Sequence, residues 1–134
     1  MTRVVDASVL VEYLTDGEHY AAVKRRIAAG PGWLWAPYLV DAEVGHALRA
    51  TVRAGEISAR RAGDVLGDLF EMRLQRVPHH LLAARAWQLR ENLSFYDGLY
   101  VALAESLGVP LLTLDARLAK APGLRAEVEV VAPL

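Results

Sequence analysis

Short apolar runs alternate with longer segments of helical periodicity along the whole chain, and this alternation constrains the fold more than any other feature. Such alternation is typical of α/β proteins, in which helices flank a mostly parallel sheet. It predicts a central sheet of about five strands. The expected strands cover residues 3–5, 33–36, 74–77, 111–113 and 128–131. The expected helices cover residues 7–14, 19–29, 40–53, 58–70, 79–91, 96–107 and 116–119.

The chain has 134 residues and contains no internal repeat or linker, so we expect a single domain over residues 1–134. Apolar residues make up 54% of the chain, which excludes a disordered protein. The absence of cysteine excludes disulfide frameworks, thiolate zinc sites and cysteine nucleophiles. No apolar stretch resembles a signal peptide or a membrane span, so we expect a soluble, cytoplasmic protein without a membrane association.

Four acidic residues occupy corresponding places on this predicted framework. Asp6 and Asp115 each follow an expected strand, and Glu43 and Asp97 each lie in the first turn of an expected helix. The strand-to-helix junctions of a parallel sheet share one edge, which is where ligands normally bind. The sequence therefore predicts that the four carboxylates lie on one rim of the sheet.

Each acid also has a simpler interpretation as a helix cap or a first-turn charge, which the helix dipole stabilises. Residues 94–97, Ser-x-x-Asp, resemble a capping box. Several ionised carboxylates in one cleft repel one another unless a cation screens them. Oxygen ligands without histidine or cysteine at metal spacing favour a hard ion such as Mg²⁺ or Mn²⁺. Such a site suits phosphodiester hydrolysis. The sequence lacks the glycine-rich phosphate loops and the G-x-S-x-G elbow.

Four segments, in order, resemble the motifs of PIN-domain ribonucleases, specifically the VapC-type toxins of bacterial toxin–antitoxin systems. They are residues 4–14 (VVDASVLVEYL), 37–48 (PYLVDAEVGHAL), 93–105 (LSFYDGLYVALAE) and 111–118 (LLTLDARL). Each motif is weakly specific alone, but the four together span nearly the whole chain. The resemblance implies a three-layer PIN-like fold and a metal-dependent endoribonuclease.

The resemblance also assigns roles to individual residues. The catalytic, metal-binding carboxylates of the family match Asp6, Glu43, Asp97 and Asp115. Ser8 and Thr113 match hydroxyl residues that orient the carboxylates or a metal-bound water. The family often has Asn three residues after the second acid. This chain has His46 there, which we expect to be partly buried.

Several further residues are candidates for contacts with RNA or with other proteins. Arg49, Arg53 and Arg117 are candidates for phosphate contacts, and Tyr96 and Tyr100 for the lining of a substrate cleft. We expect Asp41 to be a solvated first-turn residue, and Trp33 and Trp35 to be core or partner-contact residues.

The implied reaction is the hydrolysis of RNA phosphodiesters by metal-activated water, which leaves a 5′-phosphate and a 3′-hydroxyl. Toxins of this family commonly cut RNAs such as transfer RNA, are inhibited by a cognate antitoxin protein, and form homodimers. The helices over residues 40–70 are candidates for both protein contacts, because Leu66, Leu69 and Phe70 offer apolar surface. The same three residues could equally pack only the core of the monomer.

The competing hypothesis is a receiver-like or non-catalytic α/β signalling module, phosphorylated on one acid. A receiver needs a paired acidic cluster near the first strand and a lysine after the last. Asp6 has no acidic neighbour, and Lys120 falls within an expected helix.

The overall charge is compatible with an RNA substrate. The chain has 15 basic and 16 acidic residues, and without the four candidate ligands 12 acids face 15 bases. Near-neutral charge therefore excludes only a protein that coats nucleic acid nonspecifically.

Overall fold

The computed structural model describes residues 2–28 and 32–131. The strands are β1 (Arg3–Val5), β2 (Leu34–Pro37), β3 (Leu74–Val77), β4 (Leu111–Thr113) and β5 (Val128–Val130). The helices are α1 (Ala7–Leu14), α2 (Tyr20–Ile27), α3 (Leu39–Arg53), α4 (Ala59–Glu71), the 3-10 turn η1 (His79–Leu81), α5 (Ala83–Gln88), α6 (Phe95–Leu107) and α7 (Ala116–Lys120).

The five strands form one parallel sheet in the order β3-β2-β1-β4-β5. The chain moves from β1 toward β3 in the first half and returns past β1 to β4 and β5 in the second. This reversal makes the space beside β1 and β4 the topological switch point, where open α/β sheets bind ligands. The predicted mostly parallel sheet of about five strands is confirmed.

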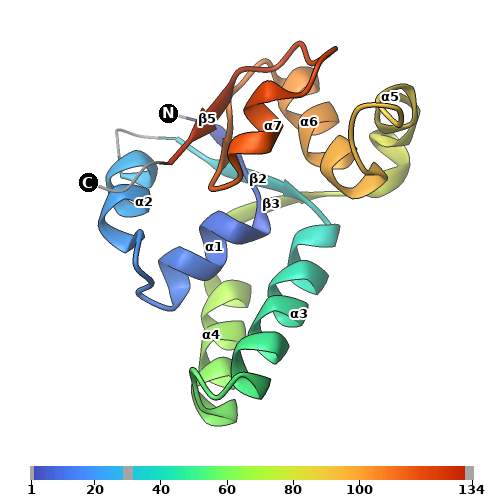
Figure 1. Ribbon diagram of the computed structural model, residues 1–134. Coiled ribbons are helices and arrows are strands. Elements are labelled where there is room, and N and C mark those ends of the chain that lie inside the picture. The colour runs from blue at the N-terminus through green and yellow to red at the C-terminus, as the bar shows by residue number, and fades with distance from the viewer. Residues whose placement is uncertain (1, 29–31, 132–134) are drawn as a thin grey trace.

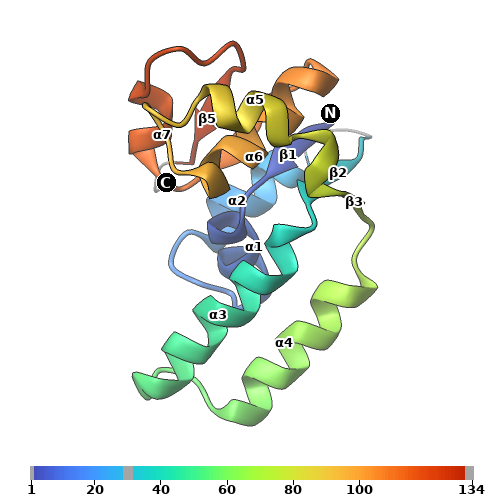
Figure 2. The same ribbon diagram turned by 90° about the vertical axis from the view of Figure 1, so that its right-hand side faces the viewer.

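The reversal also places helices on both faces of the sheet. Helices α1 to α4 cover one face, with α3 and α4 extending from it as an antiparallel pair, and α5, α6 and α7 cover the other (Figure 1, Figure 2). This arrangement gives the predicted three layers. No helix in residues 2–28 and 32–131 is long and apolar enough to cross a bilayer.

The inner strands and α6 form the centre of the core. Successive residues of a strand face opposite sides of the sheet. Even so, both sides are buried in the inner strands, where no surface is exposed at Val4, Val5, Leu111 and Leu112. This pattern is expected for a parallel sheet covered on both faces. Residues 98–104 of α6 are all buried, because α6 packs between the sheet and α5.

Most expected elements are present within two residues of their predicted ends, but one helix is wrong. Residues 79–91 form η1 and the short α5 instead of one continuous helix. Leu82 separates the two, with φ −111° and ψ −12°, and its side chain is buried in the core. The predicted end of the helix over residues 19–29 lies outside the described residues, and α2 is described from Tyr20 to Ile27.

Gly98 allows α6 and α5 to pack closely. A Cβ at Gly98 would lie 3.2 Å from the Cα, Cβ and carbonyl oxygen of Ala86. We expect Gly98→Ala to lower the free energy of unfolding by about 1–3 kcal/mol, because backbone atoms cannot move aside cheaply. Urea denaturation measures this change. Gly67→Ala in α4 is the matched control, since a Cβ there has nothing within 4 Å. It should raise stability by about 0.5–1 kcal/mol.

Candidate active site

Asp6 lies directly after β1 and begins α1, and its carboxylate is bonded on both oxygens. Its Oδ1 accepts hydrogen bonds from the Ser8 hydroxyl at 2.5 Å and from the Val9 N–H at 3.2 Å. Its Oδ2 accepts a bond from the Thr113 hydroxyl. Asp6 therefore caps α1 and also joins β1 to β4, so the capping and site interpretations both apply to it.

Thr113 and Ser8 connect Asp6 to the fourth acid. The register pairs Val5 with Leu112, so Asp6 comes level with Thr113 on the neighbouring strand. The Thr113 hydroxyl accepts a bond from the Asp115 N–H at 3.0 Å, and the Ser8 hydroxyl accepts one from the Leu114 N–H at 3.2 Å. These two hydroxyls fix the β4–α7 turn against the start of α1.

Glu43 is held by a residue of a different layer. It lies in the second turn of α3, one turn later than predicted, because α3 begins at Leu39. Its Oε1 accepts a hydrogen bond of 2.6 Å from the hydroxyl of Tyr100 on α6. This bond spans the end of the sheet and joins α3 to α6.

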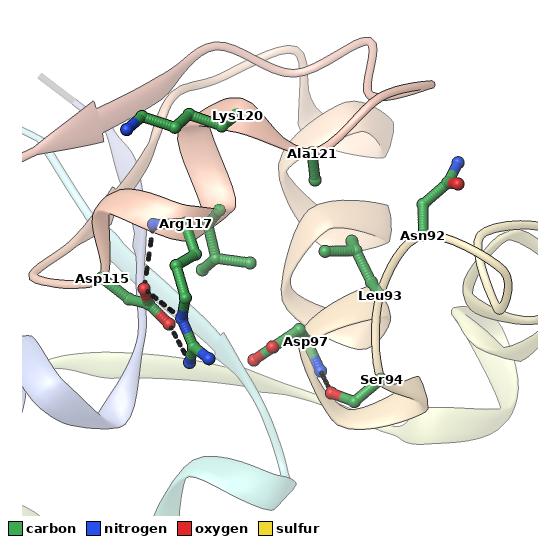
Figure 3. Close-up of a pocket in the computed structure, with 9 residues that line it drawn as sticks. Asn92, Leu93, Ser94, Asp97, Asp115, Arg117, Lys120 and Ala121 are labelled. Carbon is green, nitrogen blue, oxygen red and sulfur yellow. Dashed lines mark hydrogen bonds and ion pairs between the residues drawn. The ribbon is translucent and has the colours of Figure 1, made fainter.

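Asp97 lies in the first turn of α6. The Ser94 hydroxyl accepts a bond of 3.1 Å from the Asp97 N–H and thereby caps the helix. This cap fixes the backbone of Asp97, and Figure 3 shows its carboxylate pointing toward Asp115 and Arg117.

The pKa values show that the four acids share one electrostatic environment. Burial raises the pKa of Asp6, and the charge of Asp97 raises it further against the lowering effect of the hydroxyl bonds. Burial likewise raises the pKa of Glu43, to which Asp97 and Asp6 also contribute. Burial and the charge of Asp115 raise the pKa of Asp97. The ionised forms of Asp6, Glu43 and Asp97 are therefore destabilised, mainly by burial and further by at least one neighbouring acid.

Asp115 is the exception, because Arg117 neutralises it. The Arg117 guanidinium donates bonds to both Asp115 oxygens, at 3.1 and 2.9 Å, and its backbone N–H donates another at 2.9 Å. These bonds lower the pKa of Asp115. The Arg117 side chain is 89% exposed, so it can turn from Asp115 to an incoming phosphate with little loss of packing.

Two hollows flank the carboxylates. The first is a cleft of about 630 Å³ that contains Asp97, Asp115 and the cations Arg117 and Lys120 (Figure 3). The second is a mainly apolar hollow of about 420 Å³, and its lining includes Glu43, His46 and Tyr96. We call them the cationic cleft and the apolar hollow.

Other candidate residues lie away from the carboxylates. Arg49 and Arg53 line a separate groove of about 350 Å³ between α3 and α4. Tyr100 is only 2% exposed, so its predicted place in a substrate cleft is wrong. Its hydroxyl bonds Glu43 instead.

Three further expectations also need correction. His46 is exposed rather than partly buried, because its position on α3 faces the apolar hollow. Asp41 is not simply solvated but forms a two-bond ion pair with Arg76, at 2.7 and 2.8 Å.

Leu69 is fully buried and offers no contact surface, whereas Phe70 is 62% exposed. Trp33 is 51% exposed, and Trp35 packs against the core.

The sequence did not predict the roles of two site residues. Tyr100 lies three residues after Asp97, and its link to Glu43 depends on how α6 faces α3, which no spacing shows. Lys120 lies three residues after Arg117 on α7, and that spacing alone could have placed it on the same cleft.

The oxygen ligands of the four acids and their neighbouring hydroxyls are of the type that a hard divalent ion prefers. Their side chains are not arranged around a common point in this structure. Four carboxylates with neighbouring hydroxyls offer only oxygen ligands, and their mutual repulsion is the kind that a cation relieves. In the part of the chain that the structure describes, no three His, Asp or Glu side chains stand close enough together to hold an ion. Asp115 is turned toward Arg117, so closing the set requires it to leave that exposed ion pair.

A parallel α/β sheet with acids at its switch point defines a class of protein, and comparisons with known proteins identify it. The family model of the PIN domain matches residues 3–124. Ribonuclease VapC1 of Mycobacterium tuberculosis is 49% identical over 131 residues, which cover 96% of both chains. Ribonuclease VapC12 of the same organism is 41% identical over 129 residues, or 96% of this chain and 98% of the relative.

A solved toxin–antitoxin complex from Klebsiella pneumoniae has the same fold. It superposes with a TM-score of 0.65 at 19% identity and covers 98% of this chain and 99% of the other. The chain therefore belongs to the PIN-domain family, and within it to the VapC ribonucleases. This group is metal-dependent, in agreement with the oxygen donor set.

Thr113 offers a direct test of the hydroxyl network. We expect Thr113→Val to lower the free energy of unfolding by about 1–3 kcal/mol, because Asp6 loses a donor and the Asp115 N–H loses its acceptor. The hydroxyl favours the ionised form of Asp6, so the loss should grow as Asp6 ionises. It should be smaller at about pH 5 than at about pH 8 in urea denaturation.

Thr113→Ser is the control, because it removes a methyl group and keeps the hydroxyl. Its cost of about 0.8 kcal/mol should not change with pH. Equal pH profiles for the two variants would contradict the role given to the hydroxyl.

Proposed function

We propose that the protein is a metal-dependent endoribonuclease toxin whose reaction centre comprises Asp6, Glu43, Asp97 and Asp115. One observation carries this proposal. Burial, and to a smaller extent neighbouring acids, raise the pKa values of Asp6, Glu43 and Asp97 beside a cleft that contains two cations, in a chain 49% identical to a ribonuclease. Structural caps alone would have no reason to share one charged environment.

The ion we assign to the site is Mg²⁺, with Mn²⁺ as an acceptable substitute. Both are hard ions that take carboxylate oxygens and water. Held by these acids, the ion would supply an activated water and would neutralise charge on the phosphate. Asp97 and Glu43 are the ligands we expect to change position least, because the Ser94 cap fixes the Asp97 backbone and Tyr100 bonds the Glu43 carboxylate.

The protein's own residues bind and orient the RNA in the cationic cleft. Arg117 and Lys120 attract the phosphate backbone, and Arg117 can exchange its bonds to Asp115 for phosphate oxygens. Ser8 and Thr113 keep the Asp6 carboxylate in a fixed orientation. Tyr100 does the same for Glu43 and therefore acts as a positioning residue.

The reaction is hydrolysis of the bond between phosphorus and the 3′ oxygen. Water forms the new bond to phosphorus, the 3′ oxygen leaves and takes a proton, and the products are a 5′-phosphate and a 3′-hydroxyl. Transfer RNA is the substrate class we expect.

We further propose that the toxin is inhibited by a cognate antitoxin protein and forms a homodimer in the cytoplasm. The solved toxin–antitoxin complex with the same fold supports the first assignment. The groove between α3 and α4, with Arg49 and Arg53 at its rim and Phe70 exposed on α4, is the surface that such contacts would use. In this arrangement the two arginines meet protein rather than RNA.

The receiver-like alternative gains no support from the geometry. A phospho-accepting aspartate needs a free carboxylate oxygen, whereas both oxygens of Asp6 accept hydrogen bonds within a buried network. Lys120 lies in α7 on the cationic cleft and not after the last strand.

Asp97→Asn should abolish most RNA cleavage. We expect the rate constant for cleavage to fall more than about 100-fold, because several kcal/mol of charge stabilisation is lost with the ligand. The measurement is cleavage of bulk transfer RNA with Mg²⁺, with sequencing of the 5′-phosphate ends. Asp64→Asn is the control, since it removes an exposed carboxylate of α4 and should keep the wild-type rate. A folded Asp97→Asn protein that cuts at the wild-type rate would refute the assignment.

Metal binding should also be visible without any substrate. Without divalent ions, Asp97→Asn should melt a few degrees above the wild type, because the raised pKa of Asp97 means that its charge destabilises the folded state. Mg²⁺ should raise the melting temperature of the wild type and have much less effect on the variant. Equal shifts with Mg²⁺ would place the ion elsewhere.

A further inference from the structure

The apolar hollow contains Glu43 of the four acids, whereas the cationic cleft contains Asp97 and Asp115. Its volume is about 420 Å³, and it is lined by Leu39, Ala42, Glu43, His46, Ala47 and Tyr96. Residues of α3 and the first turn of α6 form it together. Glu43 belongs both to this hollow and to the group of acids, so whatever occupies the hollow lies beside the reaction centre.

Two rings at the hollow are exposed although they lie beside apolar surface. Tyr96 is 60% exposed, and His46 is also exposed. The neighbouring Phe95 is 40% exposed at the same helix end. Large exposed aromatic side chains gathered around an apolar hollow indicate a binding surface.

The charges of the two hollows differ, and this difference selects the occupant. Arg117 and Lys120 lie in the cationic cleft, whereas the lining of the apolar hollow contains no arginine or lysine and includes the carboxylate of Glu43. A phosphate would be repelled there. A neutral, flat group with an apolar face and polar edges would be accommodated, and an RNA base has that chemistry.

We propose that the apolar hollow receives one unpaired base of the substrate RNA, on a nucleotide adjacent to the bond that is cut. The Tyr96 ring stacks on the base, the side chains of Leu39, Ala42 and Ala47 form the floor, and His46 hydrogen-bonds the edge of the base. Tyr96 and His46 thus determine which sequences are cut. This inference rests on the proposed ribonuclease function.

The neighbouring positions of Tyr96 and Asp97 in the chain support the binding of one nucleotide by both its base and its phosphate. Tyr96 immediately precedes Asp97, whose carboxylate points into the cationic cleft (Figure 3). One turn of α6 therefore presents a ring to the apolar hollow and a carboxylate to the cleft. A nucleotide bound across this turn has its phosphate at the acids and its base against the ring.

The test combines a protein variant with a substrate variant. Wild-type protein and Tyr96→Ala are given a single-stranded RNA pool with a short randomised stretch and Mg²⁺, and the 5′-phosphate ends are sequenced. A second substrate, made from the preferred sequence, has an abasic nucleotide at each position around the cut in turn.

We expect the wild type to prefer particular bases at one position beside the cut. Tyr96→Ala should lose that preference, with KM about tenfold higher and kcat within about twofold, because stacking contributes to binding. The abasic nucleotide at that position should raise the KM of the wild type by the same factor. It should not raise the KM of the variant any further. Tyr96→Phe should retain the preference, and His46→Ala should change which base is preferred.

Trp87→Ala is the matched control, because Trp87 is 61% exposed on α5 and lines neither hollow. It should keep the wild-type preference and KM. Melting curves confirm that each variant is folded.

Three results would overturn the base site while leaving the ribonuclease assignment intact. The first is that Tyr96→Ala and the abasic nucleotide raise KM additively. The second is that Tyr96→Ala lowers kcat equally at all cut sites. The third is that Tyr96→Ala is no longer inhibited by the antitoxin while its RNA cleavage is unchanged. The last would mean that a protein side chain occupies the hollow. A folded wild type that cuts no RNA would instead refute the ribonuclease function, and the base site with it.

Discussion

The carboxylate of Asp6 is the group on which the arrangement of the site depends. It is buried at the end of the central strand, where an isolated charge would be costly. Bonds from Ser8, Val9 and Thr113 offset that cost, and each donor comes from an element that must be correctly placed to reach it. The same bonds that stabilise the charge therefore fix β1, β4 and α1 relative to one another.

Helix α6 extends this dependence to the other layer of the molecule. Tyr96, Asp97 and Tyr100 follow one another within five residues, and each faces a different feature: the apolar hollow, the cationic cleft and Glu43. Because residues 98–104 are buried on all sides, the helix cannot rotate without breaking the core. Rigid packing of α6 thus sets the distance between base-binding surface and reacting phosphate, which is a requirement of accurate positioning.

Sequence patterns predicted the fold and the gathering of acids because both follow from local signals. Apolar runs located the strands, and strand ends located Asp6 and Asp115. Orientation between helices has no such signal, so the buried place of Tyr100 was not predictable from its spacing to Asp97. The Asp41–Arg76 pair joins two distant segments and was equally invisible. The catalytic roles of the acids remain predictions that geometry and family membership support.

A nearly neutral chain can bind a polyanionic substrate because its acidic and basic groups at the site differ in exposure to solvent. Asp6, Glu43 and Asp97 are buried to an extent that raises their pKa values, whereas the Arg117 side chain is 89% exposed. An approaching RNA therefore meets the cations first and the acids only at close range. At that range the divalent ion that we propose for the acids would offset part of their combined negative charge and would offer a phosphate oxygen a cation to bind. The total charge of the chain consequently says little about its substrate, and the order in which the substrate meets those charges is what matters.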